Sequence, residues 1–258
     1  MKNFPDDFFK KSSRAECRLL MLDYDGTLAP FRTDRDQAFP YPGVEFRLDR
    51  IISDEQTTLV IISGRTIADL KPLLNLKKYP EIWGSHGWEV LTAEGQYKLS
   101  RPNESTRKGL EEARSFICNN SFEKYMELKP ASLAIHYRGV DINKILVLKN
   151  KIVDNWNSLM DRYNLTYSEF DGGLELKIPG LNKGTVVKTL MERFPRNCLT
   201  AYLGDDLTDE DAFSALPDSA LSVLVRREYR ETKARAWIKP PEELLEFFDR
   251  WIEAYDSA

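Results

Sequence analysis

The sequence predicts an α/β fold with a Rossmann-like parallel-sheet core and an inserted α/β cap domain. Short apolar runs alternate along the chain with amphipathic stretches of helical period, which is the order of an open α/β sheet. Three of the apolar runs end in polar clusters, whereas the middle of the chain carries alternating patterns of a different kind. We therefore expect a core of residues 1–87 and 173–258, interrupted by a cap of residues 88–172.

The core strands are expected at Arg18–Leu22, Thr58–Ile62 and Thr200–Leu203, where apolar runs stop at turn-forming or polar residues. Runs rich in Val, Ile and Leu are typical of parallel strands that are buried on both faces. Helical patterns follow at Thr66–Leu74 and Gly184–Phe194. Because ligands of open α/β sheets bind outside the carboxyl ends of the strands, we expect the three polar clusters to share one site.

The inserted segment is expected to form a separate lobe of strands and a helix. Ser132–Tyr137 and Leu174–Ile178 alternate between polar and apolar residues, and Ile142–Tyr163 has a helical pattern. At the end of the chain, Pro240 and Pro241 suit the first turn of a helix. The apolar face of this terminal helix is expected to contain Leu244, Leu245, Phe248, Trp251 and Ile252.

The composition, with 42% hydrophobic and 30% charged residues, is ordinary for a soluble globular protein. The net charge is −4 and no basic block stands out, so neither nucleic acid nor an anionic membrane is an expected partner. The chain has no run near the ~20 apolar residues that span a bilayer. Its three cysteines, Cys17, Cys118 and Cys198, are odd in number and lack CxxC spacing. We therefore expect reduced thiols, no disulfide framework or zinc site, and a cytoplasmic location.

The first polar cluster, Asp23-Tyr-Asp25-Gly26-Thr27, directly follows a predicted buried strand. A carboxylate at this place can attack phosphorus, and a second one can protonate the leaving alkoxide and then deprotonate water. Glycine allows a tight turn that brings backbone N–H groups to a phosphate. The alternative is a solvated turn after a strand.

The next two clusters could supply phosphate contacts. Ser63 can donate a hydrogen bond to a phosphate oxygen, and Arg65 can bind phosphate or substrate. Lys183 is the candidate for the positive charge that an anion needs when it attacks a dianion. The alternatives are an N-cap serine that opens a helix and an ordinary surface lysine.

The densest acidic cluster contains Asp205, Asp206, Asp209, Glu210 and Asp211. Carboxylates at a strand end repel one another unless a cation lies among them, and ligation by oxygen alone suits Mg²⁺. The alternative is an acidic first turn of a helix, which the helix dipole favours. His86 and His136 lack a second ligand at metal spacing, so a zinc or iron site is not expected.

These clusters, in this order, resemble the haloacid dehalogenase superfamily of phosphatases. The resemblance implies that Asp23 is the nucleophile and Asp25 the acid and base, with Asp25 also reaching the metal through its carbonyl. It further implies phosphate binding by Ser63, Gly64 and Lys183. The implied Mg²⁺ ligands are Asp23, Asp25 and Asp205, with Asp209 as a water-mediated or outer helper. The long gap between Ser63 and Lys183 has room for a full α/β cap.

A narrower resemblance is to trehalose-6-phosphate phosphatases. It rests on LDYDGTL, IISGR, GSHG, the ExKxxSxxxHYR stretch from Glu127, LELKIP, NKG and GDDLTDEDAF. In that family two cap glutamates and a lysine hold sugar hydroxyls, which implies Glu127, Lys129 and Glu175 here. The other candidate substrate contacts are Arg65, His86, Ser132, His136 and Arg138. Lys177-Ile178-Pro179 departs from the family's frequent Arg-Pro pair.

The resulting expectation is Mg²⁺-dependent hydrolysis of trehalose 6-phosphate to trehalose and phosphate through an aspartyl phosphate, in trehalose biosynthesis. The expected partner is a small sugar phosphate, with a functional link to a trehalose-phosphate synthase. One alternative is a phosphatase for sucrose phosphate or a glycosyl-3-phosphoglycerate. Another is a non-catalytic sensor of sugar phosphate.

Overall fold

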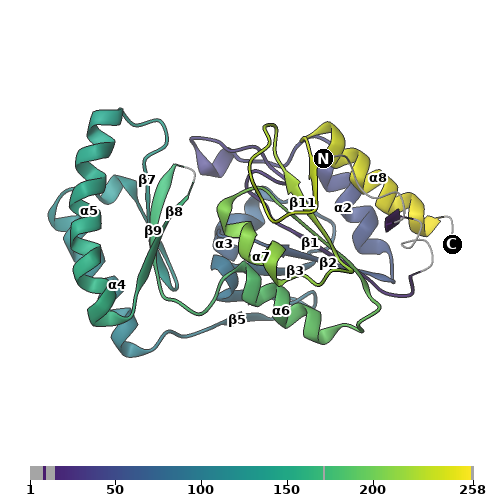
Figure 1. Ribbon diagram of the computed structural model, residues 1–258, viewed down its shortest axis with the longest axis horizontal. Coiled ribbons are helices and arrows are strands. Elements are labelled where there is room, and N and C mark those ends of the chain that lie inside the picture. The colour runs from purple at the N-terminus through teal and green to yellow at the C-terminus, as the bar shows by residue number, and fades with distance from the viewer. Residues whose placement is uncertain (1–7, 10–14, 171, 257–258) are drawn as a thin grey trace. The chain divides into compact units, whose positions relative to one another are not determined.

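A computed structural model describes residues 8–9, 15–170 and 172–256. The chain forms two compact units, Met1–Lys98 with Asn182–Ala258, and Leu99–Leu181. Each unit combines a β-sheet with helices, as Figure 1 shows, so the predicted α/β class is confirmed.

The border between the two units differs from the expected cap of residues 88–172. Two short strands, β4 (Glu89–Leu91) and β5 (Tyr97–Leu99), extend the core sheet. At the return, β9 (Gly173–Lys177) pairs with strands of the second unit. Both borders therefore lie later in the chain, because backbone pairing rather than the nearest turn decides to which unit a strand belongs.

The core sheet has eight strands in the order β12-β11-β10-β1-β2-β3-β4-β5. Neighbours from β12 to β3 run parallel, and β4 is antiparallel to β3. From β1 the chain continues to β2 and β3 on one side, and it later adds β10, β11 and β12 on the other. The strand order thus reverses beside β1, where open sheets place their ligands. The remaining bounds are β1 (Arg18–Leu22), β2 (Thr57–Ile62), β3 (Glu81–Gly84), β10 (Leu199–Gly204), β11 (Leu221–Val225) and β12 (Ala236–Ile238).

Helices cover both faces of the core sheet, since alternate strand residues point to opposite sides. Leu20 and Leu22 of β1 join one apolar cluster with α2 (Val44–Ser53) and α8 (Glu242–Asp256). Leu19 and Met21 join the other cluster, with α6 (Lys183–Arg193) and α7 (Glu210–Ala215). The predicted helix Thr66–Leu74 is instead a short α3 (Ile67–Leu70) followed by η2 (Lys71–Leu73), and Thr66 caps it.

The second unit is an antiparallel sheet in the order β6-β7-β9-β8. Its side chains alternate: Leu133 and Ile135 are fully buried beside a helix layer, and Glu127 and Lys129 belong to the opposite, polar face. The polar face is where the candidate sugar contacts lie. The bounds are β6 (Met126–Lys129), β7 (Ser132–His136), β8 (Thr166–Phe170), α4 (Glu104–Asn119) and α5 (Ile142–Tyr163).

A disulfide joins Cys17 to Cys198, which corrects the expectation of reduced thiols throughout. Cys17 directly precedes β1 and Cys198 directly precedes β10, and Leu199 N donates to Cys17 O at 2.9 Å. The two cysteines are 181 residues apart in sequence, and their proximity follows from the parallel pairing of β1 with β10. Cys118 is a free cysteine. The cytoplasmic location stays a prediction.

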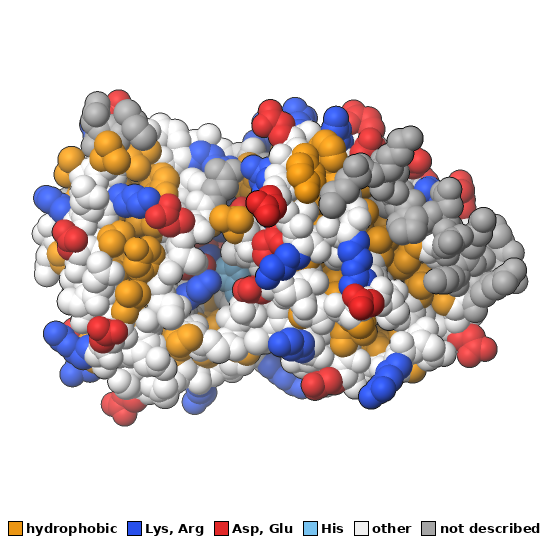
Figure 2. Space-filling model, in the orientation of Figure 1, with side chains coloured by type: hydrophobic (Ala, Val, Ile, Leu, Met, Phe, Trp, Pro, Cys, Tyr) orange, Lys and Arg blue, Asp and Glu red, His pale blue; other side chains and the backbone are white. Residues whose placement is uncertain are grey.

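No helix within the described residues is long and apolar enough to cross a membrane. On the face seen in Figure 2, Lys and Arg side chains lie interspersed with Asp and Glu.

Candidate active site

Asp23, Ser63 and Asp205 follow three neighbouring strands at their carboxyl ends, as the sequence predicts. Asp23 comes directly after β1, and its N–H donates to Leu203 O of β10 at 2.9 Å. Ser63 follows β2 and Asp205 follows β10, and all three residues are buried. The strand pairing therefore assembles one site from parts that are far apart in sequence.

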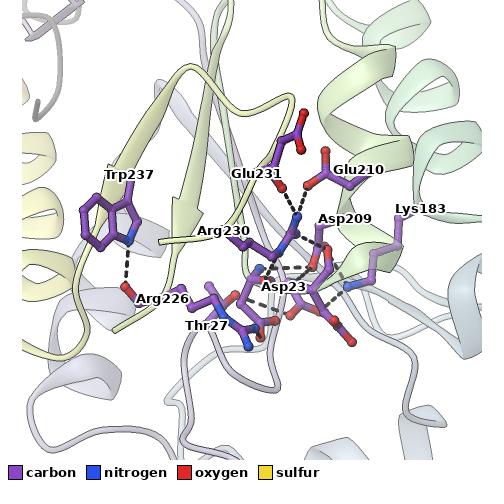
Figure 3. A network of polar contacts seen from close by, with 11 residues as sticks. Asp23, Thr27, Lys183, Asp209, Glu210, Arg226, Arg230, Glu231 and Trp237 are labelled. Carbon is purple, nitrogen blue, oxygen red and sulfur yellow. Dashed lines mark hydrogen bonds and ion pairs between the residues drawn. The ribbon is translucent and has the colours of Figure 1, made fainter. Parts of the chain in front are cut away.

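Lys183 lies between two of the acidic residues, as Figure 3 shows. Its Nζ donates to Asp23 Oδ1 at 2.6 Å and to Asp209 Oδ1 at 2.7 Å, and the residue is 3% exposed. Burial alone would lower the pKa of Lys183, but the charges of Asp209 and Asp23 outweigh it and raise that pKa above its ordinary value. Lys183 is the first residue of α6, whose N-terminus is held by a capping box between Asn182 and Thr185. The lysine is therefore a fixed cation beside Asp23, not a surface residue.

Asp209 is a fully buried acceptor of four hydrogen bonds. Its Oδ1 accepts from Lys183 and from Tyr202 Oη, the latter at 2.5 Å. Its Oδ2 accepts from the backbone N–H groups of Asp205 and Asp206 at 3.1 and 3.0 Å. Both oxygens are thus engaged by the protein, so the geometry favours the helper role over direct metal ligation.

The arrangement of the three buried aspartates fits a divalent cation. Carboxylate oxygens of Asp23, Asp205 and Asp209 lie within 4.8 Å of one another, and all three residues are buried. Asp205 Oδ1 has no hydrogen-bond partner among the described residues. Gly26, at φ +88°, lets the backbone lie against this carboxylate, because a Cβ there would be 2.1 Å from Asp205 Oδ2. A buried oxygen without a donor, next to a second carboxylate, is what a hard cation such as Mg²⁺ binds.

The electrostatics support the same fit. Burial raises the pKa of Asp23 to about 7, although Lys183 opposes the shift. Burial, followed by the negative charge of Asp23, raises the pKa of Asp205 well above its ordinary value. The cluster therefore carries more negative charge than Lys183 balances, and a bound divalent cation would restore the balance.

Arg65 forms a bidentate ion pair with Asp25. Its Nε and Nη2 each lie 2.7 Å from an oxygen of the Asp25 carboxylate. The guanidinium is 2% exposed, whereas the Asp25 side chain is 27% exposed. The structure places Arg65 against the predicted acid and base, and its expected contact with substrate stays a prediction.

The Ser63-Gly64-Arg65 turn is held by the Gly84–Gly87 segment. Ser85 N donates to Arg65 O at 2.7 Å, and His86 N donates to Ser63 O at 3.0 Å. The His86 ring packs on Gly64, where a Cβ would lie 2.8 Å from His86 Cε1. Ser85 and His86 both have positive φ, at 49° and 56°. The structure therefore brings His86 to the phosphate-binding turn that the sequence predicts.

Five of the expected sugar contacts form one cluster on the polar face of the second unit. His136 Nε2 lies 2.6 Å from Glu127 Oε2. Glu175 Oε1 accepts from Lys129 Nζ at 2.9 Å and from Ser132 Oγ at 2.7 Å. Lys129 Nζ also lies 3.8 Å from Glu127, so it joins the two glutamates.

Arg138 lies just beyond β7, at the turn between β8 and β9. Its side chain packs over Gly172, where a Cβ would lie 2.9 Å from Arg138 Nε.

For several residues of the site, the sequence predicted no role. Thr27 Oγ1 donates to Asp23 Oδ2 at 3.4 Å, and Tyr202 binds Asp209 from inside β10. Arg226 Nη1 lies 3.9 Å from Asp205 Oδ2, and Arg230 Nε donates to Asp205 O at 3.3 Å. Thr27 lay in a recognised motif, whereas the arginines lie in a connection without any local pattern that signals a role.

Comparison with known proteins identifies the family. The model of the trehalose-phosphatase family matches residues 21–236. A probable trehalose-phosphate phosphatase H of Arabidopsis thaliana is 29% identical, with 91% of this chain and 72% of the relative covered. A trehalose-phosphate phosphatase of Mycobacterium ulcerans is also 29% identical, with 90% of this chain and 60% of the relative covered. A bifunctional trehalose-6-phosphate synthase/phosphatase of Thermoproteus tenax is 28% identical, and the chain covers 29% of it.

A solved structure shows the same fold. The C-terminal domain of the C. albicans trehalose-6-phosphate phosphatase matches with a TM-score of 0.77 and 23% identity, over 95% of each chain. The two proteins therefore share their fold. Because the family model matches most of its length, this chain belongs to the trehalose-phosphatase family and is a phosphoric monoester hydrolase.

Proposed function

We propose that the protein hydrolyses trehalose 6-phosphate to trehalose and phosphate through an aspartyl phosphate on Asp23, with Mg²⁺ as cofactor. The observation that carries the proposal is the buried group of Asp23, Lys183 and Asp205 at the carboxyl edge of the sheet, with Asp25 beside it. Family membership supports the substrate.

The chemistry of the first step follows from these side chains. A carboxylate oxygen of Asp23 attacks phosphorus, the bond between phosphorus and the sugar oxygen breaks, and protonated Asp25 gives its proton to the departing alkoxide. Lys183 offsets the repulsion between the anionic nucleophile and the phosphate. Asp23, Asp205 and the Asp25 carbonyl would hold Mg²⁺, which when bound would neutralise further charge on the phosphoryl group.

In the second step Asp25 acts as a base. It takes a proton from a water molecule that attacks phosphorus, and the bond from phosphorus to Asp23 breaks. Phosphate leaves, and Asp23 returns as a carboxylate. Ser63 and the backbone around Gly64 hold the phosphate in both steps, and His86 fixes that turn.

We further propose that the polar face of the second unit recognises the sugar. Glu127 and Glu175 can accept hydrogen bonds from pairs of hydroxyls, and Lys129 can donate to sugar oxygens. The ion pairs among these side chains favour this use, because they fix the carboxylates in the absence of substrate. A functional link to a trehalose-phosphate synthase is part of the proposal, supported by the relative whose name joins both activities.

The main rivals differ in substrate or in catalysis. A phosphatase for sucrose phosphate or a glycosyl-3-phosphoglycerate would share the core residues and differ in the sugar contacts. A non-catalytic sensor of sugar phosphate would have no need of a paired acid and base such as Asp25. The intact core set therefore favours an enzyme over a sensor.

The test is phosphate release from a panel of trehalose 6-phosphate, sucrose phosphate and a glycosyl-3-phosphoglycerate, with Mg²⁺ and with EDTA. We expect trehalose 6-phosphate to have the highest kcat/KM and EDTA to abolish release. Asp23→Asn should abolish turnover in a folded protein, with Asp218→Asn, an exposed aspartate of another loop, as the control. A low rank for trehalose 6-phosphate would refute the substrate, and an active Asp23→Asn variant would refute the mechanism.

A further inference from the structure

Arg230 reaches from the connection between β11 and β12 to the acidic loop that follows β10, as Figure 3 shows. Its Nε donates to Asp205 O at 3.3 Å and its Nη2 donates to Asp206 O at 2.8 Å. Its Nη1 donates to Glu231 O at 2.9 Å and to the Glu210 carboxylate. One planar side chain thus binds two successive carbonyls of the loop that carries the metal ligand.

Glu210 completes the link from the other side. Besides Arg230, its carboxylate accepts from Thr232 Oγ1 at 2.7 Å and from Lys233 N at 2.8 Å. The side chains of Arg230 and Glu210 are 19% and 18% exposed, so solvent screens this ion pair less than one at the open surface. The β11–β12 connection and the start of α7 are therefore tied together around the loop.

The backbone of this loop decides where the Asp205 carboxylate lies. The Asp205 N–H is held by Asp209, and its carbonyl is held by Arg230. The carboxylate itself is 2% exposed and lies against Gly26, where a Cβ would be only 2.1 Å away. A small rotation of the loop would therefore move the carboxylate relative to Asp23, and the contacts on both sides of the residue resist it.

We propose that Arg230, with Glu210 as its counter-ion, is a positioning residue that holds Asp205 in the geometry required for Mg²⁺. The inference rests on the proposed metal site. Arg230 acts on Asp205 through its backbone carbonyl, not through its carboxylate, and its positive charge by itself would weaken cation binding. The orientation that Arg230 gives to Asp205 would strengthen Mg²⁺ binding, whereas the charge of Arg230 would weaken it. Substitutions that remove one and keep the other can separate these two effects.

Arg230→Lys keeps the charge and loses the planar fork that serves several acceptors at once. Groups that orient metal ligands typically contribute 10–100-fold to metal affinity. We therefore expect Arg230→Lys to weaken Mg²⁺ binding roughly 10-fold or more. Arg230→Met should also weaken it, but less, because the repulsive charge leaves with the fork.

The measurement is the Mg²⁺ dissociation constant of the metal-free full chain, from isothermal titration calorimetry and from the Mg²⁺-dependent rise in Tm. The matched control is Arg235→Lys, because Arg235 binds the carbonyls of Pro217, Asp218 and Ala220 in a loop of the same sheet that carries no proposed ligand. The control should bind Mg²⁺ within about twofold of the unchanged protein, well below the expected effect. Phosphate release by Arg230→Lys should recover at saturating Mg²⁺.

Unchanged Mg²⁺ affinity in Arg230→Lys, or tighter binding in Arg230→Met, would overturn the inference while leaving the proposed function intact. Absence of Mg²⁺ binding by the unchanged protein would instead overturn the proposed metal site. If both Arg230 variants fail to fold, the Mg²⁺ affinity of Glu210→Gln tests the inference instead. It removes the counter-ion and keeps an amide oxygen as acceptor, so we expect a smaller loss of affinity, and an unchanged affinity would count against the inference.

Discussion

At the scale of single residues, the site is defined by carboxylates that the protein buries with too little compensating charge. Asp23 and Asp205 are nearly inaccessible; Lys183 Nζ lies 2.6 Å from Asp23 Oδ1, and Arg226 Nη1 lies 3.9 Å from Asp205 Oδ2. Burial is the main cause of the raised pKa values of both carboxyls. Metal binding and proton binding are therefore expected to compete at these two residues.

Mg²⁺ binding should release protons and strengthen as the pH rises through neutrality. The pKa of Asp23 is about 7 in the metal-free protein, so below that pH the carboxyl holds a proton that must leave before the cation binds. Affinity should rise by up to about tenfold per pH unit for each proton released, and level off only above the pKa values of both carboxyls. Calorimetry in two buffers of different ionisation enthalpy measures the released protons. An affinity independent of pH would contradict the expectation.

Gly26→Ala should destroy metal binding, because the new methyl group would occupy the space of the Asp205 carboxylate. Gly95 provides the control, since it has a similar φ of +85° but no described atom within 4 Å of the added Cβ. Both substitutions carry a backbone cost of about 1–2 kcal/mol in the free energy of unfolding. Only Gly26→Ala should also lose Mg²⁺ affinity and phosphate release. Equal Mg²⁺ affinity in the two variants would show that the close approach is unimportant.

At the scale of elements, strand ends are what the sequence predicts best. The bounds of β1 agree with the prediction, and those of β2 and β10 differ by a residue or so, because buried parallel strands are uniformly apolar. The strand β5 was not predicted, since it is short and exposed. Whether Arg65 would bind substrate or Asp25 was likewise not readable, because it depends on how two strand ends meet in space.

The Arg65–Asp25 pair predicts an effect that depends on the leaving group. Arg65→Lys loses the bidentate fork that orients the Asp25 carboxyl, so proton transfer from Asp25 to the leaving group should be less well aligned. In a series of aryl phosphates, which lack sugar, kcat/KM should fall little for acidic phenols and by about 10²-fold for basic ones. A uniform loss would indicate phosphate binding instead. Asp25→Asn should show the same dependence of kcat/KM on the basicity of the phenol. The double variant should lose little more kcat/KM than Asp25→Asn alone.

At the scale of the whole molecule, the Cys17–Cys198 disulfide ties together the two chain segments that form the core. Both cysteines lie at the amino ends of their strands, whereas Asp23 and Asp205 follow the carboxyl ends. The bond should therefore affect stability and leave catalysis unchanged.

Replacing Cys17 and Cys198 by serine should lower the free energy of unfolding by about 2–5 kcal/mol, because the bond closes a long loop in the unfolded chain. Denaturant unfolding measures the loss, and kcat should stay the same. Cys118→Ser is the control, because Cys118 is free. A reductant should produce the same loss in the unchanged protein and none in the double variant.

The same bond gives the chain an unusual covalent topology. The second unit, Leu99–Leu181, lies wholly within the stretch between the bonded cysteines, so backbone and disulfide together make a closed ring that includes it. A protease that cuts once anywhere in that unit would open the ring without separating the pieces. The nicked protein should migrate as one species on a non-reducing denaturing gel and as two after reduction. Two fragments without reductant would show that the ring is not closed.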